Sequence, residues 1–411
     1  MRRSALHGVV GLVVYGLVGG TAVARADVVL DWNTIMMSTL ATQNPFAQAR
    51  FAAITETAVF EAVNAITGDD DPYLGTVTAP PGASAEAAAA AAAHGVLTNY
   101  LPASAASLDA ALVTSLAAIP DGPAKDDGVA VGEAAAAAMI AERTNDGSAP
   151  PQFYTPTSTD PGQWQLTPGC TAGVFLHWRD LKPFGVLRTD QFRPGPPPAL
   201  TSGLYTKVYD EVKTVGAVDS TVRPPDRTDV ARYFAVASAP HVWNQAARQV
   251  SAAEERSLSE NARTFALLNM ALSDGLASVM EAKYHYVFWR PYTAIRAGDT
   301  DGNPRTDPDP TWNPLISTPC FPSYPSAHAV ASYAARKIAE KTLGSGTIDV
   351  TLSHPGVPDV TLHYTRFSQI TDDIDDARVF GGIHFRSDQD TGGKQGRDIG
   401  GYVYHHNLRP R

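Results

Sequence analysis

Three short stretches in the C-terminal half of this 411-residue chain place basic side chains close to residues that can carry protons. They read Lys-x6-Arg-Pro, Pro-Ser-x-His and Arg-x5-His-x3-Asp. Such residues can neutralise a tetrahedral oxyanion and move protons to or from it. We therefore predict a single oxyanion pocket built from Lys283, Arg290, Ser326, His328, Arg378, His384 and Asp388.

The first stretch places Lys283 and Arg290 seven residues apart, on a helix expected to run to about residue 290, before Pro291. Seven residues are nearly two helical turns, so both cations should lie on one face. An ordinary solvated surface would also explain two cations. The residues between them are mostly aromatic, however, and buried cations require a compensating charge. This pattern favours a bound anion.

The second stretch, Pro325-Ser326-Ala327-His328, opens a predicted helix. The free N–H groups and the positive dipole end of a helix N-terminus suit an oxyanion. Ser326 adds a hydroxyl donor, and His328 can act as an acid or a base near neutral pH. Taken alone, Ser326 would be an ordinary helix cap.

In the third stretch, Arg378 and His384 flank Gly381-Gly382, which should end a helix and let both side chains turn inward. His384 and Asp388 are four residues apart, so the carboxylate can bond one imidazole nitrogen. Fixing the tautomer in this way leaves the other nitrogen free as a ligand or nucleophile.

The elements that must position these residues are predicted to be mostly helical, because apolar residues recur at helical intervals. Residues 145–199 are rich in Pro, Gly, Ser and Thr with interspersed aromatics, which predicts a long irregular segment covering the site. A short β-like stretch is expected over 348–352, and no alternating pattern is sustained enough for a large sheet. Helices are expected over 45–66, 84–96, 104–118, 129–143, 204–215, 227–237, 242–253, 259–290, 326–341, 367–380 and 386–404.

The composition is that of a globular protein, with 44% hydrophobic and 18% charged residues. The balance of 32 basic against 42 acidic residues gives a net charge of −10, and no basic cluster suggests nucleic-acid binding. An anion must therefore be captured by a local site against the global field. We expect residues 27–411 to form a single large helical domain, with an N-terminal half (27–199) and a site-bearing C-terminal half (200–411).

The first 26 residues are typical of a secretory signal. Arg2 and Arg3 precede an apolar run over residues 9–23, and an Ala-Arg-Ala cleavage motif follows at 24–26. A membrane anchor is the alternative, but the apolar run is short and rich in glycine. No later segment reaches the roughly 18 apolar residues that would span a bilayer. We expect a secreted or periplasmic protein with no membrane span after signal removal.

The composite motif resembles the vanadium-dependent haloperoxidases and their relatives, the type 2 phosphatidic-acid-phosphatase-like acid phosphatases. The resemblance extends over essentially the whole mature chain and implies an all-α fold built on helical bundles. It is closest to secreted bacterial haloperoxidase-like members, on the segments 27–33, 62–65, 191–194, 288–291 and 293–296.

The resemblance implies a role for each anion-binding residue. Lys283, Arg290 and Arg378 would neutralise the equatorial oxygens of vanadate or phosphate. The Ser326 hydroxyl and the Ala327 backbone N–H would add hydrogen bonds.

It also implies the roles of the proton-carrying residues. His384, supported by Asp388, would bond the vanadium, or attack phosphorus in a phosphatase. His328 would take a proton from incoming peroxide, or give one to a leaving alcohol.

Several positions depart from the family pattern. Ala327 stands where glycine is common; it keeps the N–H donor unless the position needs a positive φ. Ala377 replaces a frequent serine, which removes a supporting hydrogen bond. Phe321 occupies the position that tunes halide preference and resembles the chloroperoxidase-like choice. The two cysteines alone leave open one disulfide or two buried thiols. Cys320 stands where relatives tend to have proline, and its company with Cys170 in the covering segment favours a Cys170–Cys320 disulfide.

The leading hypothesis is a vanadate-dependent peroxidase that oxidises halide with hydrogen peroxide, releasing hypohalous acid or halogenating a small organic acceptor. One alternative is an acid phosphatase that uses the same pocket through a phosphohistidine, because phosphate and vanadate share charge and shape. A second alternative is a non-catalytic helical protein that binds an oxyanion.

Overall fold

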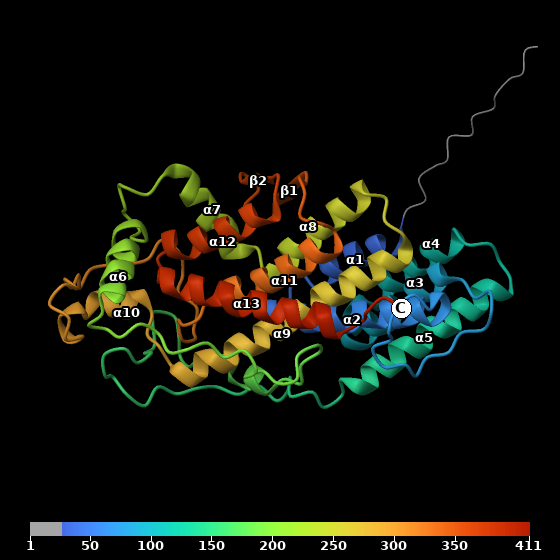
Figure 1. Ribbon diagram of the computed structural model, residues 1–411, viewed down its shortest axis with the longest axis horizontal. Coiled ribbons are helices and arrows are strands. Elements are labelled where there is room, and N and C mark those ends of the chain that lie inside the picture. Colours follow the sequence, from blue (N-terminus) through green and yellow to red (C-terminus); the bar gives the residue numbers. More distant parts are fainter. Residues whose placement is uncertain (1–26) are drawn as a thin grey trace, which may run out of the picture.

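The computed structural model describes residues 27–411, and the predicted signal sequence over residues 1–26 lies outside them. The regular elements of the described chain are almost all helices (Figure 1). The helices are α1 (Val28–Thr39), α2 (Pro45–Thr67), α3 (Ala85–Tyr100), α4 (Ala105–Ala117), α5 (Pro123–Glu142), α6 (Gly203–Val215), α7 (Pro225–Val236), α8 (Ala239–Ala253), α9 (Leu258–Tyr286), α10 (Pro291–Arg296), α11 (Ala327–Thr342), α12 (Phe367–Phe380) and α13 (Arg386–His406).

One small sheet accompanies the helices. Strands β1 (Val350–Ser353) and β2 (Thr361–Tyr364) pair antiparallel, with Val350 opposite Tyr364. The prediction of an all-α fold is confirmed. Within residues 27–411, no helix is long and apolar enough to cross a membrane.

The structure corrects several element predictions. Helix α1 was not predicted, and neither was β2, the partner of the expected strand. Helix α5 begins at Pro123, six residues before the predicted start. Proline suits the first position of a helix, because its φ is already helical and its missing N–H has no intrahelical partner there. A further correction concerns the end of α9 and is described with the site.

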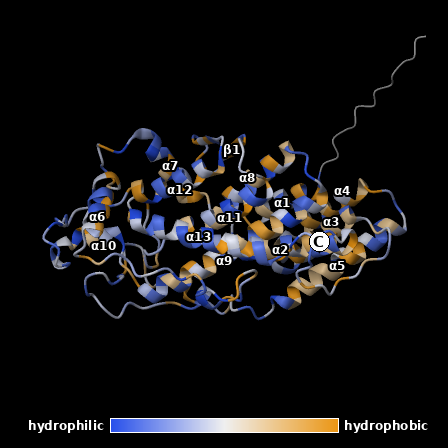
Figure 2. Cartoon of the chain, viewed as in Figure 1, coloured by the Kyte–Doolittle hydropathy of each residue, from blue (hydrophilic) through white to orange (hydrophobic). Residues whose placement is uncertain are grey.

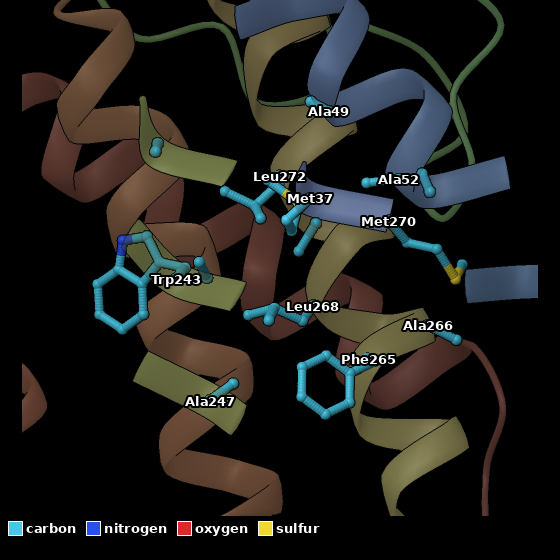
Figure 3. Close-up of a cluster of buried hydrophobic side chains, with 14 of the residues drawn as sticks. Met37, Ala49, Ala52, Trp243, Ala247, Phe265, Ala266, Leu268, Met270 and Leu272 are labelled. Carbon is cyan, nitrogen blue, oxygen red and sulfur yellow. The ribbon is translucent and has the colours of Figure 1, made fainter. Parts of the chain in front are cut away.

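Helix α9 is the central helix and packs against α2, α11 and α13. Its buried side chains join those of the N-terminal helices in one hydrophobic core that extends from Val28 to Leu408. Figure 2 shows hydrophobic residues along α3 and α5 at one end of the molecule. Part of the core is drawn in Figure 3, where α1, α2, α8 and α9 contribute Met37, Ala49, Ala52, Trp243, Leu268 and Leu272.

Helices α11 and α13 run side by side at close range (Figure 1). Glycines of α13 recur every four residues at this contact, and Gly396 is the closest of them. A Cβ atom at Gly396 would lie 2.3 Å from the carbonyl oxygen of Val330. The close approach brings the two N-termini together, and the Ser326 N–H donates to the Asp388 carbonyl at 3.0 Å.

The irregular segment 145–199, here called the strap, is held to the helices at several points. A disulfide joins Cys170 to Cys320, and beside it the Val174 N–H donates to the Cys320 carbonyl at 2.9 Å. Further along, the buried Asp274 of α9 accepts hydrogen bonds of 2.7 to 2.9 Å from three successive strap N–H groups, at residues 184–186. The strap is thus an ordered cover and not a free linker.

Candidate active site

Six segments of the chain converge on one buried polar region. Lys283 comes from the last turn of α9, and Arg290 precedes α10. Arg378 lies in the last turn of α12. The N-terminus of α11, the α12–α13 connection and the first turn of α13 contribute Ser326, Ala327, His328, His384 and Asp388.

Lys283 and Arg290 do not share a helix, so the prediction of one helix over 259–290 is wrong at its C-terminal end. Helix α9 stops at Tyr286, and Val287 adopts a left-handed conformation with φ of 50°. Arg290 then sits as the residue before α10 in an extended conformation. The two cations reach the same region from consecutive elements, and not from one helical face.

Lys283 and Arg290 are fully buried, yet their partners are mainly carbonyl groups. The Lys283 ammonium donates to the carbonyl oxygens of Pro322 at 2.8 Å and Ser323 at 2.7 Å. Arg290 donates through Nε to the Phe321 carbonyl at 2.9 Å. Neither cation forms a salt bridge within residues 27–411, so their charges are not neutralised by the protein.

Arg378 completes a group of three buried cations. Its Nη1 donates to the Phe234 carbonyl at 2.8 Å, while its Nε has no hydrogen-bond partner among the described residues. The Nη2 of Arg290 is likewise without one. Unpaired N–H groups of buried cations are costly unless an anion binds them. A small oxyanion therefore fits this set in charge and in donor supply.

Burial shifts the ionisation of all three cations toward the neutral form. It lowers the pKa of Arg290 to about 9 and that of Arg378 to about 10. Burial and then the charge of Arg290 hold the pKa of Lys283 well below its ordinary value. A bound anion would act in the opposite direction, because a nearby negative charge favours the charged form of each group.

His384 is held between an acceptor and a donor. Its Nδ1 lies 2.8 Å from Asp388 Oδ2, and its Nε2 lies 3.0 Å from Arg290 Nη1. A guanidinium can only donate and a carboxylate can only accept. Nδ1 therefore carries the proton, and Nε2 presents a lone pair. The predicted His384–Asp388 contact is present, although His384 precedes α13 instead of lying on it.

Ser323 is a site residue that the sequence analysis did not identify. Its hydroxyl donates to Asp388 Oδ2 at 2.6 Å and lies 3.3 Å from His384 Nδ1. Burial raises the pKa of Asp388 to about 6, and the Ser323 hydrogen bond opposes this shift. Ser323 thus helps to keep Asp388 ionised as the acceptor for His384.

His328 differs from His384 in its exposure and its partners. It is half-buried, lines a cavity together with Arg378, and forms no hydrogen bond in the described structure. Burial lowers its pKa well below the usual value, and the charges of Arg378, Lys283 and Arg290 add to the effect. Without a bound anion the ring is therefore neutral at pH 7 and able to accept a proton.

The N-terminus of α11 adds backbone donors. Ser326 caps the helix, and its hydroxyl accepts from the Ala329 N–H at 3.4 Å. Ala327 occupies the first helical position, where the N–H has no acceptor within the helix. Its φ is not positive. Alanine therefore costs no backbone strain here, and the departure from the family's glycine is compatible with the site.

The polar region opens into a cavity of about 430 Å³ with mostly apolar walls. Phe321 lies between the cavity and the cations, since its ring centroid is 5.2 Å from both Lys283 Nζ and Arg290 Cζ. Phe46 of α2 and Phe175 of the strap also line the cavity. No spacing signal marked these two residues, because they come from segments far apart in the chain.

Comparison with known proteins matches the C-terminal part of the chain. Residues 263–410 fit the model of the VCPO second helical-bundle domain. The vanadium chloroperoxidase of Curvularia inaequalis is 28% identical over 174 residues, which cover 34% of this chain and 28% of that enzyme. The region matched by the family model contains every predicted oxyanion-binding residue. The match to the curated relative spans little more than a quarter of that enzyme's length.

Comparison with solved structures covers nearly the whole chain. A bacterial vanadium-dependent iodoperoxidase superposes with a TM-score of 0.79 and 24% identity, over 93% of this chain and 96% of that one. A bacterial vanadium-dependent chloroperoxidase in its apo form gives 0.73 and 17%, over 88% and 94%. The chain therefore has the helical fold of the vanadium haloperoxidases, and the resemblance drawn from its motifs is confirmed.

Proposed function

We propose that this chain, which has the vanadium haloperoxidase fold and the second helical-bundle domain of that family, is a vanadate-dependent peroxidase that oxidises halide with hydrogen peroxide. The observation that carries the proposal is the group of three buried cations, Lys283, Arg290 and Arg378. Each of the two arginines has one unpaired N–H group, and beside them lies the unprotonated Nε2 of His384. This arrangement fits an oxyanion that also accepts a nitrogen ligand.

Vanadate bound there would supply a Lewis acid that activates hydrogen peroxide toward halide. The three cations hold and neutralise the oxyanion, and the α11 N-terminus offers it the Ala327 N–H. Asp388 fixes the tautomer in which His384 Nε2 faces the anion. His328, neutral and at the cavity wall, accepts the proton that hydrogen peroxide must release.

Export from the cytoplasm is part of the proposal. The signal-like residues 1–26 support it, and so does the Cys170–Cys320 disulfide, because disulfides persist mainly in oxidising compartments. Hydrogen peroxide and halide would be the substrates, with a small organic molecule as the final acceptor of halogen.

The deciding experiment measures peroxide-dependent oxidation of iodide, bromide and chloride by vanadate-free protein, before and after addition of orthovanadate. We expect no oxidation before and turnover after. Folded protein that stays inactive toward all three halides would contradict the proposal. Hydrolysis of p-nitrophenyl phosphate that orthovanadate inhibits would instead assign the pocket to a phosphatase.

Substitution of the two histidines separates their roles. His384→Ala removes the nitrogen ligand and should abolish halide oxidation. His328→Ala should retain phosphate binding, measured calorimetrically, but lower turnover by about 10²- to 10⁴-fold, the usual contribution of general acid–base catalysis. His285→Ala is the matched control, because this neighbour of the site is exposed and should keep full activity. Equal turnover of His328→Ala and the unsubstituted protein would remove His328 from proton transfer.

A further inference from the structure

Three aromatic rings form a continuous wall of the cavity beside the oxyanion pocket. The ring centroids of Phe46 and Phe175 are 4.4 Å apart. Phe321 lies 6.3 Å from Phe46, at 90° between the ring planes, and 6.4 Å from Phe175. These are the separations and tilts at which aromatic rings attract one another. A further planar ring entering the cavity would meet the same type of surface.

The wall is built from rigid segments. Phe46 sits in the first turn of α2, after the capping Asn44 and Pro45. Phe175 follows Val174, and Phe321 follows Cys320. These two preceding residues are joined, because the Val174 N–H donates to the Cys320 carbonyl, and Cys320 is also disulfide-bonded. Binding to such a wall costs little ordering entropy.

Phe175 is also held in a left-handed conformation with φ of 62°. This conformation is rare for a bulky residue and is found mostly where the surrounding structure enforces it at a functional site. The strap therefore accepts backbone strain at the residue that places an aromatic ring in the cavity. Packing of the strap alone would be satisfied by many less strained arrangements.

The chemistry of the cavity also restricts the charge of its occupant. The polar lining residues are Ser317, His328 and Arg378, and the others are apolar. A cationic molecule would be repelled by Arg378 and the two cations behind it, whereas a carboxylate would compete with the oxyanion for them. The volume of about 430 Å³ lies near the lower end of small-molecule sites. A neutral molecule of one or two rings fits these limits.

We propose that this cavity binds a neutral, electron-rich aromatic molecule of one or two rings as the acceptor of the oxidised halogen. The proposal rests on the proposed function, which supplies hydrogen peroxide and halide. Two electrons pass from the halide to hydrogen peroxide, which becomes two water molecules with one net proton consumed. The ring loses the proton of one C–H bond, and a carbon–halogen bond forms in its place. The halogen is then transferred within the cavity before it reaches bulk solvent.

Binding is tested without turnover, by equilibrium dialysis of 2-naphthol against vanadate-free protein saturated with phosphate. Phosphate occupies the oxyanion pocket, so naphthol bound under these conditions reports on the cavity. Val236 lines the cavity and is 44% exposed. Val236→Arg should weaken binding at least about tenfold, because it brings a charge to an apolar wall. Val222→Arg is the control, since Val222 is 59% exposed and does not line the cavity.

We expect the control to bind 2-naphthol like the unsubstituted protein, and both variants to bind phosphate normally. No measurable naphthol binding, or equal binding by Val236→Arg and Val222→Arg, would overturn the proposal. The apolar wall would then serve the halide alone.

Turnover gives an independent test by competition between 2-naphthol and the charged phenol-4-sulfonate. The ratio of halogenated products from the complete enzyme is compared with the ratio that reagent hypohalite produces. We expect the enzyme to favour 2-naphthol at least about fivefold more than the reagent does, and Val236→Arg to lose this preference. Identical ratios would overturn the proposal while leaving halide oxidation intact. Naphthol binding without any halide oxidation would contradict the proposed function and leave the aromatic site standing.

Discussion

At the scale of single residues, the site is defined by charges that the protein does not neutralise itself. Lys283 and Arg290 are fully buried, and their nearest partners are backbone carbonyls or a neutral histidine. A buried charge without a counter-charge is strongly destabilising. The charge of Asp388 opposes the lowering of the Arg290 pKa by burial, but its Oδ2 already accepts hydrogen bonds from His384 and Ser323. The charges of the site therefore favour the binding of an external oxyanion.

This charge balance makes a prediction about His328. Burial, and then the charges of three cations, hold its pKa low when no anion is bound. Phosphate binding introduces negative charge close to the ring and should raise this pKa, so that the proton is bound more tightly at any given pH. Titration of the His328 ring protons by NMR, with and without phosphate, measures the shift.

Chloride at the same ionic strength is the control for this titration, because it screens charge without occupying a tetrahedral oxyanion site. An unchanged or lower titration midpoint with phosphate would show that the cations facing His328 are not the ones that bind the anion.

The chemistry of the site residues could be predicted from the sequence, whereas the contribution of Ser323 could not. Basic, acidic and imidazole side chains at fixed spacings restrict the possible chemistry strongly, so an oxyanion pocket can be predicted from the sequence alone. Ser323 is an ordinary serine three residues before Ser326, and nothing in its type or spacing indicates that it reaches Asp388. Its role depends on the path of the loop before α11.

At the scale of elements, long-range backbone contacts decide where helices end. The aromatic residues after Lys283 continue a helical pattern, so the sequence predicted a helix to about residue 290. In the structure the Val287 carbonyl accepts from Trp164 of the strap at 2.7 Å, and the Phe288 carbonyl accepts from Ser323 at 2.8 Å. These bonds replace intrahelical ones and free Arg290 to turn toward His384. Local propensity cannot anticipate partners more than 30 residues away.

The contact between α11 and α13 makes a prediction about one glycine. Gly396→Ala should destabilise the protein by about 1–3 kcal/mol, the usual cost of overpacking, because the new Cβ would lie 2.3 Å from the Val330 carbonyl oxygen. Denaturant unfolding measures the change. The same contact positions Ser326 and Asp388, so phosphate affinity should fall as well.

Gly401→Ala on the same helix is the matched control. Its Cβ would meet nothing nearer than a flexible lysine atom at 3.9 Å. It should therefore stabilise by up to about 1 kcal/mol, through the higher helix propensity of alanine. If both variants moved stability in the same direction, helix propensity and not the close helix contact would control this region.

At the scale of the whole molecule, the strap connects parts of the chain that lie far apart in the sequence. The cavity wall takes one ring each from residues 46, 175 and 321. Helical periodicity predicts where helices lie but not which of them meets a distant loop, such as the contact of Phe46 with Phe175. Composition correctly indicated that residues 145–199 are irregular and rich in anchoring aromatics. Cysteine counting left the pairing of the two cysteines open, and the departure of Cys320 from the family's proline, with Cys170 in the covering segment, favoured the disulfide that the structure contains.

The Cys170–Cys320 disulfide closes a loop with a sequence separation of 150 residues, so its removal should affect the stability of the entire fold. Loop-closure entropy for such a length gives roughly 5 kcal/mol, and measured losses on removing native disulfides are about 2–5 kcal/mol. We expect the double variant Cys170→Ser, Cys320→Ser to lose stability in this range, measured by denaturant unfolding. The three cations come from α9, α12 and the residue before α10 and not from the strap, so phosphate affinity of the folded variant should change little.

Reduction of the unsubstituted protein provides the internal control. A reducing agent should lower its unfolding midpoint to that of the double variant and leave the double variant unchanged, because only the former has a bond to break. In the reduced protein and in the double variant, naphthol binding should weaken more than phosphate binding does. Phe175 and Phe321 are held beside the disulfide, whereas the three cations come from α9, α12 and the residue before α10. Loss of phosphate binding in parallel would mean that the strap organises the oxyanion pocket itself and not only the aromatic wall.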